Sequence, residues 1–185
     1  MPEIYHFASN DDLPAHYSQQ IRDFMRIVWV DVLGHHLVAP VTPVEWNPHF
    51  CILAEGTALI SSATVVWKRL EHAGQTYKVY GLSGVMTYPA HRQMGYGRRI
   101  VQEATDYIRA AGDADLAILW TGPNLHGFYA LHGWEHPDAI TVTVGDPTDP
   151  QPVNGHLMMM FLSDHARAHR PDFAAAPLYF GPHSW

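Results

Sequence analysis

Residues 84–112 read GVMTYPAHRQMGYGRRIVQEATDYIRAAG, and this stretch predicts a strand, a glycine-containing turn and a helix. The apolar run up to Thr87 is typical of a strand end, and Pro89 stops the strand because proline has no amide hydrogen. Gly95 and Gly97 let the backbone turn tightly. Apolar side chains then recur at helical spacing, and Gly112 suits the end of the helix. The apolar stripe consists of Ile100, Val101, Ala104, Tyr107, Ile108 and Ala111.

A turn of this kind at the start of a helix is a candidate anion site. The first amides of a helix have no partner within the helix, and the helix dipole favours negative charge at that end. Arginines at positions 92, 98 and 99 add positive charge. The alternative is an ordinary strand, turn and helix with solvated arginines. The predicted anion-binding residues are Arg92, Gln93, Met94, Gly95, Tyr96, Gly97 and Arg98.

Two short motifs follow one another in the chain, the turn at residues 89–97 and the aromatic stretch FYALHGW at residues 128–134, and in this order they resemble the GNAT N-acetyltransferase superfamily. Pro89-x-x-Arg92-x-x-Gly95-x-Gly97 is similar to its acetyl-CoA motif, and residues 128–134, FYALHGW, are similar to its downstream aromatic motif. The resemblance covers residues 50–136. It implies an α+β fold, with a mixed, mostly antiparallel twisted sheet that is flanked by helices and has splayed central strands.

The resemblance also implies site roles, with acetyl-CoA as cosubstrate. The amides of residues 93–98 would hold its pyrophosphate, and a main-chain amide at Val85 or Met86 would polarise the thioester. Tyr129 would protonate the leaving thiolate, because a phenol of pKa about 10 holds its proton at neutral pH. The residues expected along the pantetheine arm are Val85, Met86, Thr87 and Asn124.

Within the superfamily the chain looks like the aminoglycoside 2′-N-acetyltransferases. The likeness includes Arg69-Leu70, Gly84-Val85, residues 131–134 and the final Trp185. Where those enzymes carry a glutamate that acts through water, this chain has Ser83, which is a poor base. His126, His132 and Glu45 are the alternatives for that role. Glu45, Trp46 and Trp185 are the expected acceptor-binding residues.

Composition sets the broad class of the protein. A chain of 185 residues with 47% hydrophobic content predicts one globular domain spanning residues 1–185. No apolar run is long enough for a membrane span, no signal peptide is read, and a single cysteine fits a reducing cytoplasm. A net charge of −7 argues against nucleic acid as a partner. The resemblance suggests a homodimer as one form of assembly.

The remaining periodicities predict further elements around this centre. A helix is expected over residues 13–32, and residues 35–48 read as an irregular loop. Residues 68–75 are polar and read as a turn, whereas residues 163–185 are expected to form a packed tail with little regular structure. The expected strands are residues 3–7, 50–54, 58–67, 76–87, 114–120, 139–144 and 156–162.

The 14 histidines raise the question of a metal site. His165 and His169 are four residues apart, and His35 and His36 are adjacent, but no third ligand follows from spacing. No metal is therefore predicted, and Cys51 in its apolar run is expected to be an inert core thiol.

The predicted activity is transfer of acetyl from acetyl-CoA to a primary amine, without a covalent enzyme intermediate. A small-molecule acceptor is expected, with aminoglycosides among the candidates. Two alternatives remain: acetylation of a protein or peptide, and a non-catalytic acyl-CoA-binding module.

Overall fold

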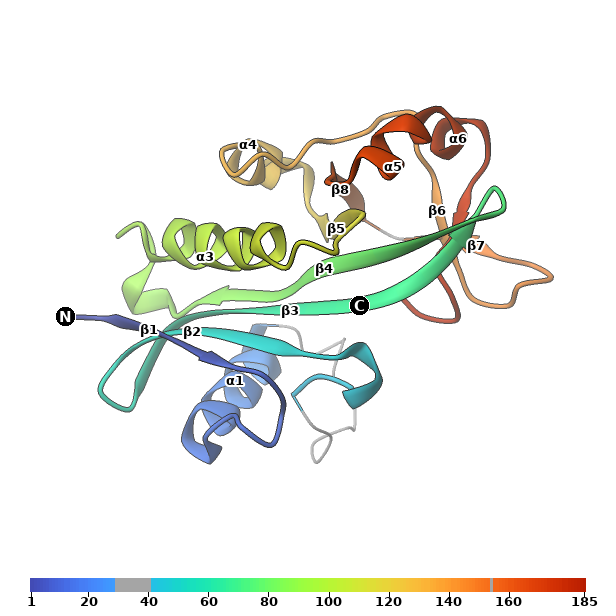
Figure 1. Ribbon diagram of the computed structural model, residues 1–185. Helices are drawn as coiled ribbons and strands as arrows, with labels where there is room; N and C mark the ends of the chain where they lie inside the picture. Colours follow the sequence, from blue (N-terminus) through green and yellow to red (C-terminus); the bar gives the residue numbers. More distant parts are fainter. Residues whose placement is uncertain (29–40, 154) are drawn as a thin grey trace. The chain divides into compact units, whose positions relative to one another are not determined.

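The computed structural model describes residues 1–28, 41–153 and 155–185. Two compact units account for their contacts. Unit 1 comprises Met1–Val66 with Ser83–Ala104, and unit 2 comprises Trp67–Leu82 with Thr105–Trp185. Strand β3 (Ala58–His72), strand β4 (Gln75–Thr87) and helix α3 (Tyr96–Ala110) contribute residues to both units (Figure 1). Each unit is described by itself below.

Unit 1 is built on an antiparallel ladder. Strand β1 (Glu3–Phe7) pairs with β2 (His49–Glu55), and β2 pairs with the first part of β3. Side chains alternate between the two faces of a strand, so every second residue of β2 points the same way. One face packs against helix α1 (Ala15–Val28). Its buried residues are Leu13, Tyr17, Ile21, Phe24, Phe50, Ile52, Ala54, Leu59 and Met86.

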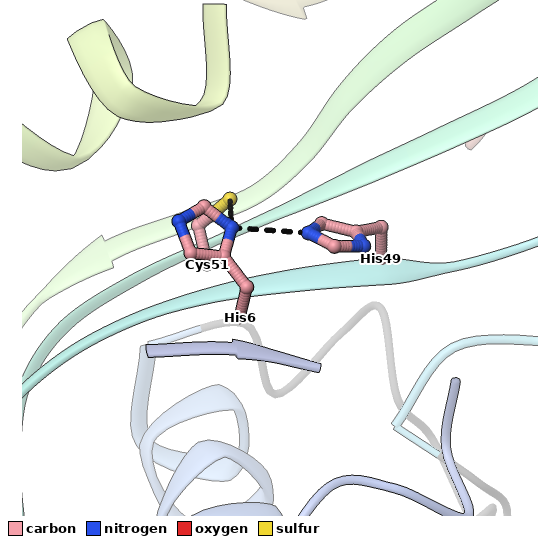
Figure 2. Close-up of side chains that lie close together, drawn as sticks. All are labelled: His6, His49 and Cys51. Carbon is pink, nitrogen blue, oxygen red and sulfur yellow. Dashed lines mark hydrogen bonds between the residues drawn. The ribbon is translucent and has the colours of Figure 1, made fainter. Parts of the chain in front are cut away.

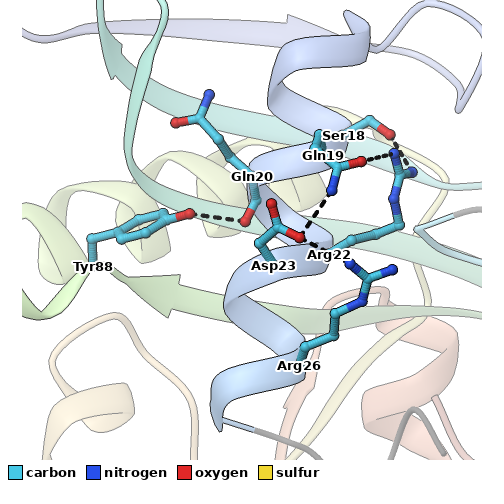
Figure 3. A network of polar contacts seen from close by, with 7 residues as sticks. All are labelled: Ser18, Gln19, Gln20, Arg22, Asp23, Arg26 and Tyr88. Atoms are coloured by element: carbon cyan, nitrogen blue, oxygen red, sulfur yellow. Dashed lines mark hydrogen bonds and ion pairs between the residues drawn. The ribbon is translucent and has the colours of Figure 1, made fainter. Parts of the chain in front are cut away.

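Polar contacts on α1 hold the chain at the point where it leaves β4 (Figure 3). The Tyr88 hydroxyl donates a 2.9 Å hydrogen bond to the main-chain carbonyl of Gln20. The Gln20 side chain in turn donates to the Thr57 carbonyl at 2.8 Å and accepts from the Leu59 amide at 2.9 Å. The residue just before Pro89 is therefore tied to α1 and to the β2–β3 turn.

Unit 2 contains the parallel part of the sheet. Strand β5 (Leu116–Thr121) pairs antiparallel with β8 (His156–Phe161) along its whole length, but its parallel register with β4 ends at Gly81 and Ile118. A parallel pairing of β4 and β5 that stops at these residues is consistent with the expected splayed central strands. A separate small ladder joins β7 (Gln151–Pro152), β6 (Val142–Val144) and β9 (Leu178–Tyr179).

The expectation of an irregular tail over residues 163–185 is wrong in part. The segment contains helix α5 (Asp164–Ala168), helix α6 (Arg170–Ala175) and β9. The Ser163 hydroxyl accepts from the Ala166 amide at 3.0 Å, which caps α5. Phe173 of α6 is fully buried, so packing stabilises a helix that its length alone would not.

Two other boundaries differ from expectation. Strand β3 continues to His72, and the turn to β4 is confined to Ala73 and Gly74, which have φ values of 49° and 75°. The predicted loop at 35–48 contains a 3-10 helix, η1 (Val44–Trp46). The end of the helix predicted over 13–32 lies outside the described residues, as do His35 and His36.

The predicted fold class is confirmed: the sheet is mixed, mostly antiparallel and flanked by helices. The prediction of one domain over residues 1–185 stays a prediction. Among the described helices, none combines the length and apolar character needed to cross a bilayer.

Candidate active site

The predicted anion-binding turn lies in unit 1, between β4 and α3. A 3-10 helix, η2 (Pro89–His91), leads into it, and α3 begins at Tyr96. Two residues take positive φ, Gln93 at 63° and Gly95 at 83°. A methyl group at Gly95 would meet no atom of the described residues within 4 Å apart from its chain neighbours, so glycine is needed here for backbone conformation and not for space.

The main-chain amides of residues 93–98 have no hydrogen-bond acceptor within the described parts of the chain. The first amide that does is Arg99, which donates to the Gly95 carbonyl at 3.0 Å. The turn thus presents a run of unsatisfied donors at the positive end of a helix dipole. Such a run suits the oxygens of a phosphate or diphosphate.

The three nearby arginines have different surroundings. The Arg92 Nε donates to the Thr87 carbonyl at 3.1 Å, and Arg99 donates to the Pro2 carbonyl at 3.1 Å. Arg98 is exposed, and its guanidinium meets no acceptor in the residues that the structure describes. It is therefore the arginine whose donors are most available to an anion at the turn.

The end of β4 is held by a side chain of β3. The Ser61 hydroxyl donates to the Met86 carbonyl at 2.6 Å and lies 2.8 Å from the Thr87 hydroxyl. Gly84 takes a φ of 58°, so β4 departs from regular strand geometry between Ser83 and Val85. Ser83 and Val85 are half-buried.

Tyr129, the predicted proton donor, lies in unit 2 on helix α4 (His126–Ala130). Its side chain is 6% exposed. Burial raises the pKa of Tyr129 to about 12, and a hydrogen bond with Thr121 opposes that shift more weakly. The phenol therefore keeps its proton at any physiological pH. Asn124 is exposed on the preceding 3-10 helix, η3 (Pro123–Leu125).

Two bonds tie the segment after α4 to the C-terminal half of α3. The Trp134 indole, which is 2% exposed, donates to the Thr105 hydroxyl at 3.0 Å. Arg109 donates to the His132 carbonyl at 2.7 Å. Trp134 is the last residue of the FYALHGW motif, so the motif carries both the tyrosine and one of the groups that hold it in place.

Trp185, a predicted acceptor-binding residue, packs inside unit 2. Its ring lies 4.6 Å from that of Phe180, and the Lys68 ammonium lies 4.9 Å from it. The indole also lies so close to Gly81 that a methyl group there would overlap it. The close approach of this side chain to the backbone of β4 explains the glycine in the middle of the strand.

Replacing Gly81 with alanine should therefore displace the indole. We expect Gly81→Ala and Trp185→Ala each to lower the free energy of unfolding by about 2 kcal/mol. Both substitutions remove the same packing, so the free energy of unfolding of the double variant, measured by urea titration, should be only slightly lower than that of either single variant. Gly127→Ala is the matched control, because a methyl group there meets nothing within 4 Å in the described residues beyond its own stretch of chain. Additive losses would contradict the contact.

The other two predicted acceptor-binding residues lie in unit 1. Glu45 and Trp46 share η1, where the carboxylate is exposed and the indole is half-buried. Asn47 ends the turn with a φ of 52°. An acceptor-binding role for Glu45, Trp46 and Trp185 stays a prediction.

Histidines gather where sequence spacing gave no signal. His126, His136 and His156 place ligand atoms within 4.8 Å of one another in unit 2. The Nε2 of His126 is buried and has no hydrogen-bond partner among the described residues. His136 and His156 also line a pocket of about 230 Å³. A second group, His6, His49 and Cys51, lies in unit 1. Each group joins residues from different elements, so only the fold brings them together.

Comparison with known proteins identifies the family. A sequence model described as an acetyltransferase (GNAT) domain matches residues 17–136, which is more than half of the chain. The chain belongs to the GNAT acetyltransferase family. No curated protein sequence matches it.

Solved structures support the fold of this GNAT protein. It is similar to the GNAT family N-acetyltransferase YhbS from Escherichia coli, solved in complex with CoA, at 14% identity and a TM-score of 0.61, covering 98% of this chain and 89% of that one. It is also similar to an acyl-CoA N-acyltransferase from Pseudomonas aeruginosa, at 13% identity and a TM-score of 0.59, covering 86% of this chain and 99% of that one. A probable N-acyltransferase from Enterococcus faecalis is similar at 15% identity and a TM-score of 0.56. The match covers 74% of this chain but only 33% of that protein.

Proposed function

We propose that this GNAT protein transfers an acetyl group from acetyl-CoA to a primary amine of a small molecule. The observation that carries the proposal is the run of amides at residues 93–98, which together with the neighbouring Arg98 guanidinium meet no acceptor among the residues that the structure describes. The residues of the turn fit a diphosphate, because unbonded amide donors lie next in sequence to a positive charge and no contact with a carboxylate is described there.

The chemistry assigned to Tyr129 is proton donation. When the acceptor nitrogen bonds to the thioester carbonyl carbon, the carbon–sulfur bond breaks and a thiolate leaves. Tyr129 gives its phenolic proton to that sulfur and the proton lost by the amine passes to water. The Tyr129 phenolate then regains a proton from water, so no net proton is lost by the protein. Ser83, His126, His132 and Glu45 are the candidates that would order this water.

A covalent intermediate on the protein is not part of the proposal. Cys51 is the single cysteine, and it is fully buried. Burial raises its pKa to about 12, so the side chain is a thiol at neutral pH and a poor nucleophile. A buried thiol also leaves thiol reagents free to report released CoA.

Calorimetry with acetyl-CoA tests the binding half of the proposal. We expect one equivalent to bind, and acetyl-pantetheine, which lacks the diphosphate, to bind at least ~10²-fold more weakly because the amide run has nothing to hold. Equal affinity for the two ligands would contradict a diphosphate site at this turn.

Release of CoA across an amine panel tests the transfer half. The panel should contain aminoglycosides, simple polyamines and lysine-containing peptides. Turnover with a small amine supports the proposal, whereas turnover confined to peptides would favour the protein acetyltransferase alternative. Tight binding of acetyl-CoA without turnover on any amine would favour the non-catalytic acyl-CoA-binding module.

A further inference from the structure

Three potential metal ligands meet on one face of the β1–β2 ladder (Figure 2). His6 lies directly opposite Cys51 in the antiparallel register. His49 precedes Cys51 by two residues, so its side chain emerges on the same face of β2. This face is opposite the one that α1 covers, since α1 packs on Phe50 and Ile52.

The spacing of the ligand atoms fits tetrahedral coordination. The Nδ1 of His6 lies 3.1 Å from the Nε2 of His49 and 3.8 Å from the Sγ of Cys51. Zinc–nitrogen and zinc–sulfur bonds of about 2.0–2.1 Å and 2.3 Å would place tetrahedral ligands about 3.3 Å and 3.6 Å apart. All three ligand atoms lie within 4.8 Å of one another, so small side-chain adjustments would suffice.

A carboxylate already orients one of the ligands. The Nε2 of His6 lies 3.1 Å from the carboxylate of Glu103, on the half of α3 that belongs to unit 1. A hydrogen bond at one ring nitrogen leaves the other directed at the remaining ligands, as in the carboxylate–histidine–metal arrangement common in metal sites. Glu103 thus has the position of an outer-shell partner.

We propose that His6, His49 and Cys51 bind zinc or a similar divalent transition cation, with the fourth position open to water. Two imidazoles and a thiolate select such a cation over magnesium or calcium. The cation would supply the positive charge that a buried thiolate requires, and it would clamp β1 to β2. This site is separate from the proposed acetyl-CoA turn, and the tests below contain no acetyl-CoA.

The group of His126, His136 and His156 fits a metal less well. His136 already has a partner at each ring nitrogen, the Leu157 carbonyl at 2.7 Å and the Asp138 carboxylate at 3.1 Å. No sulfur is present in that group. It is therefore a matched control for a site whose defining ligand is a thiolate.

Titration of the reduced full-length protein with cobalt(II) tests the proposal. We expect one equivalent to produce thiolate-to-cobalt charge-transfer absorption, and zinc to displace it. Because Cys51 is the single cysteine, that band can come from no other site in the protein. With zinc in about 100-fold excess over its Kd, the Tm should rise by about 5–10 °C.

Variants separate ligation from folding. Cys51→Ala should abolish the band, and His6→Ala should weaken binding at least ~10²-fold, whereas His136→Ala should bind like the parent. Glu103→Gln should weaken binding about 10–100-fold without changing the band shape. His6 is about one-third exposed, so its variant keeps the test valid if Cys51→Ala does not fold. Absence of the band in the parent protein, or its persistence in a folded His6→Ala, His49→Ala double variant, would overturn the proposal.

Discussion

Tyr129→Phe is expected to lower kcat for acetyl transfer by at least ~10²-fold while leaving the fold intact. The substitution removes one oxygen from a side chain that is 6% exposed and keeps the ring that fills the site. If Tyr129 protonates the leaving sulfur, phenylalanine has no proton to give, and the thiolate must leave unaided. The affinity for acetyl-CoA should change little, because the turn at residues 93–98 is untouched.

Tyr179→Phe is the matched control for that experiment. Tyr179 is another unit 2 tyrosine, and its hydroxyl donates to the Gly145 carbonyl at 2.7 Å. Losing this bond should cost about 1 kcal/mol in the free energy of unfolding and leave kcat nearly unchanged. A Tyr129→Phe enzyme with parental kcat would remove Tyr129 from the mechanism.

The raised pKa of Tyr129 adds a prediction about alkaline stability. The folded protein holds this proton until the pH approaches about 12, whereas the unfolded chain releases it from about pH 10. Between these values the unfolded state binds fewer protons, so stability should fall as the pH rises. The parent protein should therefore lose stability more steeply over this range than Tyr129→Phe, as measured by denaturant titration at each pH.

Gly95→Ala is expected to weaken acetyl-CoA binding by about 10²-fold. Gly95 has a φ of 83°, which costs an alanine roughly 1–2 kcal/mol, so the turn would relax toward negative φ. The amides of residues 93–98 would then no longer converge, and each bond lost to a charged oxygen is worth about 1.5–3 kcal/mol. Calorimetry measures the affinity directly.

Gly112→Ala is the control that distinguishes a loss of acetyl-CoA binding from the backbone strain that alanine causes at positive φ. Gly112 follows the same helix at its other end and has a φ of 72°. Both variants should lose similar stability in urea titrations, but only Gly95→Ala should lose affinity for acetyl-CoA. Equal affinities in the two variants would place the diphosphate somewhere other than this turn.

Much of the local structure could be predicted because its causes lie close together in the chain. The turn from Arg92 to Gly97, the helix that follows and its end at Ala110, just before Gly112, all depend on neighbouring residues. The structure of residues 163–185 could not be predicted in the same way, because α5 and α6 are too short to be stable without the packing of Phe173. The continuation of β3 to His72 likewise depends on its partner in the sheet and not on its own polar sequence.

Neighbouring residues were thus sufficient to indicate the strand, turn and helix around Gly95 and, through two motifs, the GNAT family itself. Strand register brought His6 opposite Cys51, and folding of the tail placed Trp185 against Gly81. Both pairs are far apart in the sequence, and a one-residue change in the β1–β2 register would turn His6 and Cys51 to opposite faces. Tertiary structure alone therefore decides these contacts, because strand pairing joins the ligands of the candidate metal site and packing of the tail places Trp185.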